Sequence, residues 1–245
     1  MVAEKQLDEF VSRTRKAAGE NLQSVILYGS GADGDFNPEF SDLNLLCILR
    51  DASFAKLSAV APVVEWWHRH KHPVPLVMTQ QELESSADVF SIELLDMQER
   101  HRVLFGDDVV IGLRILMHLH RAQVEYELRE KLILLRQRLL LAAEKDRDLW
   151  DLLLGSISAF ATLIRHALIA MGDAAPRSKR EAVQAIADRI KLDPSALLQL
   201  LDIREHKLDR KQFEAKEVFA RYLAAVQQVT TAVDTMLDTP GPAQV

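Results

Sequence analysis

The sequence is poor in several residue types, and each shortage excludes a class of protein. Only one of the 245 residues is a cysteine, Cys47, so neither an internal disulfide nor a multi-thiolate metal site can form. Glycine and proline number 9 and 8, too few for a collagen-like or low-complexity chain. Aromatic residues make up 6% of the chain, whereas 48% of the residues are hydrophobic and 27% are charged. These values are typical of a helix-rich globular protein in a reducing compartment.

Long hydrophobic runs are also missing. The most apolar stretch, residues 152–164, contains Gly155 and Ser156 and stops at Arg165. A membrane-spanning helix needs about 20 apolar residues, so this stretch predicts a buried core helix and no membrane span. The N-terminal residues are charged and have no apolar export segment, so we expect a cytoplasmic protein.

Negative charge is concentrated in the first half of the chain. Residues 1–110 contain 10 Lys and Arg against 18 Asp and Glu, whereas residues 111–245 contain 20 against 18. The contrast indicates two units with different surfaces. Because nucleic-acid binding needs clustered cations, the acidic half makes a nucleic-acid partner unlikely on charge grounds. It is compatible with a cation site, or with a small phosphorylated ligand that brings its own metal.

The local patterns predict an α+β first unit over residues 1–108. An amphipathic helix is expected over residues 3–18, and apolar strands over 24–28, 43–49 and 74–78. The second of these strands is apolar enough to be central in its sheet. A helix over 53–70 and a capping box at Thr79–Glu82, which opens a further helix, complete the unit.

The remainder predicts an all-helical bundle over residues 109–238, followed by a flexible tail at 239–245. The expected helices cover residues 111–144, 148–171, 178–190, 193–206 and 210–237. The second of them is apolar almost all round, as a central bundle helix should be. The first has apolar surface that could face the core or a second copy of the chain, which leaves a homodimer as one expectation.

The segment most informative about chemistry is VILYGSGADGDFNPEFSDLNLLCIL, residues 25–49. A strand runs into Gly29-Ser30, where a glycine lets backbone N–H groups approach an anion and the serine adds a hydroxyl. Asp42 and Asn44 begin the next strand two residues apart, so they should point to the same side. Together these features predict a phosphate and metal cradle.

This segment resembles the signature of the DNA polymerase β-like nucleotidyltransferase superfamily, and its surroundings are similar to the aminoglycoside nucleotidyltransferases, which also carry a helical domain. The resemblance implies transfer of a nucleoside monophosphate from a nucleoside triphosphate to a hydroxyl of a small molecule or protein, in a cleft between the domains. It implies that Gly29 and Ser30 hold phosphates. It also implies that Asp42, with the residue at position 44, binds Mg²⁺ and carries catalysis.

The sequence departs from that family pattern in two places. The second carboxylate is replaced by Asn44, whose amide oxygen can bind Mg²⁺ but brings no negative charge. The third carboxylate is expected on the strand near residues 74–78, which contains none. Three readings stay open: an enzyme with weak or lost activity, an enzyme rescued by the loop carboxylates Asp33, Asp35 or Glu39, and a non-catalytic module that binds a nucleotide or a protein.

Three weaker patterns have simpler explanations. The alternating histidines 68, 70 and 72 invite a metal site, but they fall on different faces of a fraying helix end. Arg114 and His120 resemble the Arg-x(4–6)-His element of HEPN ribonucleases, but that family places the element late in its bundle, so surface charge is the better interpretation. Arg177, Lys179 and Arg180 are either a cationic lip for an anion or a solvated loop that opens a capped helix.

Overall fold

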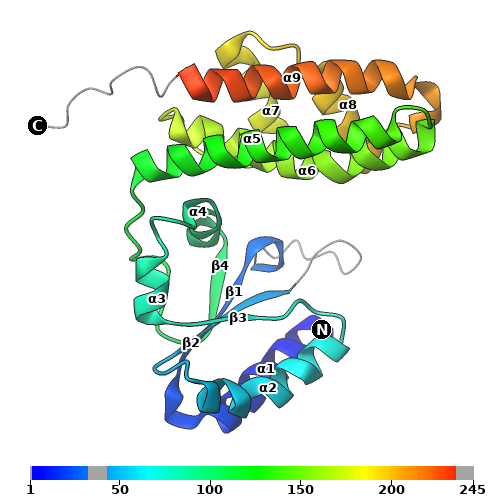
Figure 1. Cartoon of the computed structure of the whole chain (residues 1–245). Helices are drawn as coiled ribbons and strands as arrows, with labels where there is room; N and C mark the ends of the chain where they lie inside the picture. The colour runs from blue at the N-terminus through cyan, green and yellow to red at the C-terminus, as the bar shows by residue number, and fades with distance from the viewer. Residues whose placement is uncertain (1, 33–42, 236–245) are drawn as a thin grey trace, which may run out of the picture. The chain divides into compact units, whose positions relative to one another are not determined.

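The chain divides into two compact units, residues 1–116 and 117–245 (Figure 1). The computed structural model describes residues 2–32 and 43–235. The first unit contains α1 (Val2–Ala18), β1 (Leu22–Tyr28), β2 (Asn44–Leu49), α2 (Phe54–Arg69), β3 (Leu76–Thr79), α3 (Gln80–Ser85), α4 (Ser91–Glu99) and β4 (His101–Gly106). The second contains α5 (Met117–Ala142), α6 (Asp146–Ala170), α7 (Lys179–Ile190), α8 (Ser195–Arg204) and α9 (Ala215–Thr235).

The first unit is built on a mixed four-stranded sheet with the order β3-β2-β1-β4. β1 pairs antiparallel with both β2 and β4, whereas β2 pairs parallel with β3. The parallel pair needs a crossover connection, and α2 supplies it. Five of the six residues of β2 are buried, which confirms the predicted central strand. The mixed sheet followed by helices confirms the predicted α+β class.

Helices cover both faces of this sheet. α1 and α2 contact each other and lie side by side on one face (Figure 1), where Phe10 and Trp67 pack with their ring centroids 4.9 Å apart. On the other face, Leu83 of α3 and Leu94 of α4 join a core cluster with Leu46 of β2. The alternation of β2 side chains between two apolar cores explains why nearly every position of this strand is hydrophobic.

The structure corrects four details of the predicted elements. β4 was not expected, because a short edge strand carries no clear alternation of apolar and polar residues. The region after Thr79 forms two short helices in place of one, although the predicted capping box between Thr79 and Glu82 is present. β3 begins at Leu76, two residues later than predicted. Residues 111–116, expected to start the long helix, are turn and coil.

The second unit is a helical bundle around α6, which contacts α5, α7, α8 and α9. Within the described part of the chain, α6 is also the one helix long and apolar enough to cross a membrane, and 56% of its most apolar window is buried in the protein. Leu153, Ile157, Phe160 and Ile164 of this helix are almost completely buried. That environment is the one predicted for a central bundle helix.

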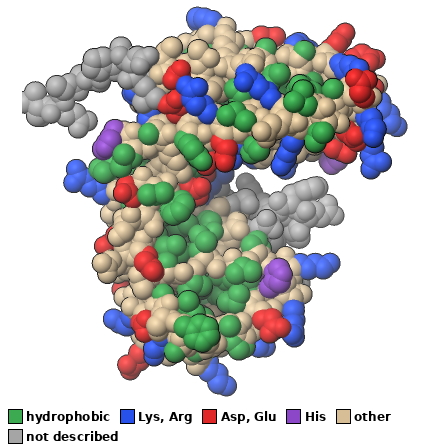
Figure 2. All heavy atoms as spheres, viewed as in Figure 1, with side chains coloured by type: hydrophobic (Ala, Val, Ile, Leu, Met, Phe, Trp, Pro, Cys, Tyr) green, Lys and Arg blue, Asp and Glu red, His purple; other side chains and the backbone are tan. Residues whose placement is uncertain are grey.

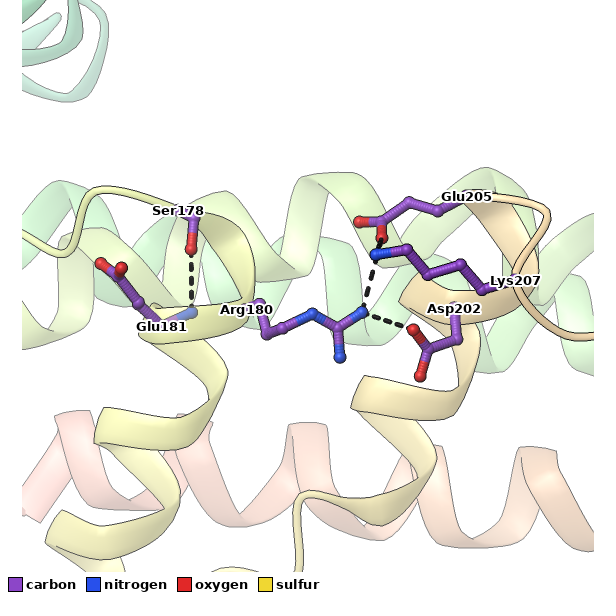
Figure 3. Close-up of polar contacts among 6 residues, drawn as sticks. All are labelled: Ser178, Arg180, Glu181, Asp202, Glu205 and Lys207. Atoms are coloured by element: carbon purple, nitrogen blue, oxygen red, sulfur yellow. Dashed lines mark hydrogen bonds and ion pairs between the residues drawn. The ribbon is translucent and has the colours of Figure 1, made fainter.

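Polar contacts define the start of α7 and link it to α8 (Figure 3). The hydroxyl of Ser178 accepts a hydrogen bond of 3.1 Å from the backbone N–H of Glu181, as expected for a helix cap. Arg180 forms ion pairs with Asp202 at 2.6 Å and with Glu205 at 3.5 Å. The guanidinium of Arg180 is therefore engaged within the bundle, which favours the structural reading of this cation over a lip that receives an anion.

Apolar side chains also reach the surface of both units (Figure 2). On α5, the exposed ones include Tyr126, Ile133, Leu140 and Leu141, and the last two are 82% and 88% exposed. Tyr126, Ile133 and Leu140 are spaced by seven residues, so they share one face of the helix. Pairing of this face with a second copy of the chain stays a prediction.

Candidate functional site

The sheet brings the Gly-Ser turn and Asn44 to the same end of neighbouring strands. β1 ends at Tyr28, and Tyr28 pairs with Asn44, the first residue of β2. A single 3-10 turn follows over Gly29–Ala32. Asp42, the carboxylate predicted to bind the metal, lies outside the described residues, as do Asp33, Asp35 and Glu39.

Gly29 occupies a backbone conformation that few other residues adopt. Its φ is +75°, in the left-handed region, and a Cβ built on it would lie 3.5 Å from Nδ2 of Asn44. The turn thus presents bare backbone beside the Asn44 amide, as a cradle for an anion requires. Any side chain at this position would need a strained backbone and would fill the space next to Asn44.

The backbone N–H of Gly29 already has a partner. It donates a hydrogen bond of 2.9 Å to the carbonyl oxygen of Arg100, at the start of β4. Because a backbone N–H is a single donor, the Gly29 amide serves to close the sheet and cannot also bind a phosphate. Any backbone donors to an anion must come from the following residues of the turn, which refines the role predicted for Gly29.

The row of side chains next to this turn consists of Asn44, Tyr28 and His101, and His101 contacts the carboxylate of Asp108. Pairing across the sheet places Asn44, Tyr28 and His101 on the same face of β2, β1 and β4. Burial raises the pKa of Tyr28, which therefore stays a neutral phenol. Nε2 of His101 lies 2.9 Å from Oδ2 of Asp108. Sequence reasoning missed this pair because it depends on β4 and on the chain that folds back after it.

Asp108 accepts hydrogen bonds from the backbone N–H groups of Val110 and Ile111 and contacts Nε2 of His101. Burial alone would raise the pKa of Asp108, but the hydrogen bonds from His101 and from the backbone N–H groups of Ile111 and Val110 together lower it. Asp108 therefore fastens the segment after β4 to the sheet as an ionised carboxylate. Because Asp108 is engaged in these contacts, it is not available as a free metal ligand.

The register also tests the position of the missing third carboxylate. Leu46 of β2 pairs with Leu76 of β3 in a parallel arrangement, so the position level with Asn44 is Val74. Val74 is 61% exposed and carries no charge. Within residues 2–32 and 43–235, no three His, Cys, Asp or Glu side chains gather closely enough to hold a metal ion. Asn44 alone offers one neutral oxygen, so the described residues do not fit a two-metal site.

The histidine-rich segment after α2 is occupied by structural contacts. His72 stacks on Trp67 with centroids 4.1 Å apart, and its Nε2 lies 3.2 Å from the side-chain oxygen of Gln6. Nδ1 of His70 bonds to the carbonyl of Trp66 at 2.8 Å, and Nδ1 of His68 lies 3.3 Å from the carbonyl of His72. These contacts support the structural explanation of the three histidines.

Two further residues from the sequence analysis have definite environments. His120 is completely buried in the bundle, where its ring meets that of His166 at 5.2 Å, so its interpretation as surface charge was wrong. Cys47 is buried within β2, and burial raises the pKa of its thiol to about 12. Burial and the raised pKa both make this thiol unreactive in the folded chain.

Comparison with known proteins agrees with this architecture. No protein-family model matches the chain, and no curated protein sequence matches it. Among solved structures, eleven chains match. One is the spectinomycin adenyltransferase AAD(9) from Enterococcus faecialis, solved with ATP and spectinomycin. The match covers 94% of this chain and 99% of that one, with a TM-score of 0.59 and 14% identity. The likeness shows that the chain shares the fold of that structure over nearly its whole length, the helical second part included.

Proposed function

We propose that the first unit is a nucleotidyltransferase-like module that binds a nucleoside triphosphate at the end of β1 and β2. The observation that carries this proposal is the bare Gly29 turn held beside Asn44, on the fold of an adenyltransferase whose structure contains ATP. Ser30 and the following residues of the same turn contact the phosphates, while Asp42 and Asn44 hold the accompanying Mg²⁺ weakly.

The ancestral reaction is transfer of a nucleoside monophosphate to a hydroxyl, and we propose that this chain performs it slowly or not at all. The metal would neutralise charge on the triphosphate and orient it. Asn44 is neutral, and so is Val74, which lies two residues before β3 and which the register of the pair places level with Asn44, so this chain contributes little charge of its own. Because charge stabilisation carries most of phosphoryl-transfer catalysis, the deficit is expected to cost several orders of magnitude in rate.

Two related functions compete with this one. In an active enzyme, the loop carboxylates Asp33, Asp35 or Glu39 would replace the missing ligands, and the acceptor would be a hydroxyl of a small molecule, as the neighbour's spectinomycin suggests, or of a protein. In a non-catalytic module, the same turn would bind a nucleotide or a partner protein without turnover. The neutral position 44 favours the second over the first.

Binding calorimetry with Mg²⁺ and each of the four common triphosphates tests the proposal. We expect weak binding that Ser30→Ala weakens and Asn44→Asp strengthens, the latter by about tenfold, because a second carboxylate adds roughly 1.4 kcal/mol of attraction for the cation. Gln81→Glu adds the same charge on α3 and should leave the affinity unchanged. If no triphosphate gives heat at millimolar concentration, the cradle is not retained.

Turnover is measured separately as release of pyrophosphate with candidate acceptors. Asn44→Asp alone should stay slow, and the double variant with Val74→Asp tests whether a carboxylate level with position 44 restores the reaction. Robust turnover by the wild-type chain that Asp42→Ala abolishes would overturn the degenerate site and favour the active enzyme.

A further inference from the structure

A cavity lies at the end of the first unit's sheet that is opposite the Gly29 turn. It is open to solvent, has a volume of about 870 Å³ and is lined by residues of α1, the start of β1, the residue after β2 and the end of β4. Leu22, one of its lining residues, begins β1, whereas the Gly29 turn follows the end of that strand. At about 3.3 Å per residue the two places are roughly 20 Å apart, so this cavity is separate from the proposed triphosphate site.

Three cationic side chains line this cavity: Arg15, Lys16 and Arg50. Their gathering stands out because residues 1–116 carry 11 Lys and Arg against 18 Asp and Glu. Elsewhere in the unit, cations such as Arg13 and Arg102 form ion pairs with glutamates. By contrast, none of the three cavity cations is in an ion pair with a carboxylate of the described residues.

Two of these cations are held in place by contacts that involve no carboxylate. The guanidinium of Arg15 lies over the ring of Phe105, 4.6 Å from its centroid. Arg50 donates from Nε to the backbone carbonyl of Glu20 at 3.0 Å, so its terminal N–H groups are not used by that bond. A guanidinium that is already fixed in this way loses less conformational freedom when it binds an oxyanion through two parallel hydrogen bonds.

The rest of the lining limits what the cavity can bind. Asp8 and Glu20 also border it, so the cavity has a small positive excess that suits one phosphate group and not a polyanion. Val11, Leu22 and Phe105 provide apolar surface beside the cations. The volume lies in the range of small-molecule sites, which is roughly 300–1,000 Å³.

We propose that this cavity is a binding site for a small phosphate monoester, whose phosphate meets Arg15, Lys16 and Arg50 and whose organic part rests on the apolar surface of Val11 and Phe105. The site is independent of the triphosphate site proposed at Gly29. A phosphorylated small molecule bound here would stabilise α1 against the sheet, because it joins residues of α1 and β4 with Arg50, the residue that follows β2.

Nuclear magnetic resonance titration of the full chain tests this site with inorganic phosphate, phenyl phosphate and phenol. Phenyl phosphate should saturate in the millimolar range and shift the backbone amides of Gly19, Leu22 and Phe105. Inorganic phosphate should bind the same amides more weakly, and phenol should leave them unmoved. Shifts that gather at Gly29 and not at these amides would assign the binding to the triphosphate site and overturn the proposal.

Variants locate the charge that binds. Arg15→Gln and Arg50→Gln should each weaken phenyl phosphate by about tenfold, since a hydrogen bond to a charged group contributes about 1.5–3 kcal/mol. Lys16→Gln is a third variant that removes no observed fold contact. Arg69→Gln, which removes an exposed cation paired with Glu65, is the matched control and should change nothing. Equal effects in all four variants, or unsaturable shifts in the wild type, would refute the site.

Discussion

Gly106, at the end of β4, is the position where one methyl group should do most damage to the first unit. Its φ is +78°, and a Cβ there would lie 1.9 Å from the carbonyl oxygen of Gln23 and 2.9 Å from Oγ of Ser24. Gln23 and Ser24 belong to β1, the neighbouring strand. The backbone atom cannot yield without disturbing the pairing of Ser24 with Gly106.

The expected cost of Gly106→Ala has two parts. A left-handed conformation costs a residue with a Cβ about 1–2 kcal/mol, and relief of the overlap costs roughly 1–3 kcal/mol more. Gly19→Ala is the matched control, because Gly19 has a φ of +56° but nothing lies within 4 Å of its added Cβ. The control should lose the conformational part only, so the difference between the two variants measures the overlap.

Denaturant unfolding followed by tryptophan fluorescence gives this difference. Trp66 and Trp67 lie in α2 and report on the first unit, while Trp150 lies in α6 and is replaced by phenylalanine in all variants to silence the second. We expect Gly106→Ala to unfold at a clearly lower denaturant concentration than Gly19→Ala. If the two variants lose the same free energy of unfolding, Gly106 does not approach Gln23 this closely.

Three other predictions concern Asp108, Cys47 and the second unit. Because the pKa of Asp108 is lowered in the folded chain, its stabilising contribution is present above the ordinary Asp pKa of about 4 and is lost as the pH falls through the lowered value. The Asp108→Asn variant should therefore be less stable than the wild type at pH 6 and should lose less free energy of unfolding on acidification. Equal acid profiles of the two proteins would contradict this. The thiol of Cys47 should react with a disulfide reagent only at the rate at which the first unit opens, so rapid labelling at pH 8 in the native chain would rule out its burial. Residues 117–238, expressed alone, should fold as a helical unit, as measured by circular dichroism. In that unit Leu153→Ala, which empties a buried position of α6, should lower the free energy of unfolding by about 2–5 kcal/mol. An unstructured fragment would show that the bundle depends on the first unit.

Local patterns were sufficient for most of the helices and for the central strands. The apolar run at residues 43–49 predicted a strand buried on both faces, because its side chains alternate between two cores. The capping residues Thr79 and Ser178 marked the starts of α3 and α7, because an N-cap acts within one helical turn. The α9 prediction began five residues early, since a short 3-10 turn at Arg210–Gln212 precedes the helix.

The candidate site was only partly readable in this way. The sequence by itself determined the residue types at the end of β1 and the start of β2, including the neutral Asn44, because the identity of a residue does not depend on its tertiary contacts. Strand register, which sets Val74 level with Asn44, was decided by the pairing of β2 with β3. Register depends on contacts between distant segments, so no local pattern contains it.

The sequence therefore determined the fold class, the central strands, most helices and the shortage of carboxylates, because each follows from residue type and from spacing along one element. Only the tertiary structure decided that the Gly29 amide is used by the carbonyl of Arg100, and that Arg15, Arg50 and Phe105 line one cavity. These groups come from segments far apart in the chain. The backbone hydrogen bonds and packing that bring them together are formed across the sheet, and no stretch of sequence specifies them alone.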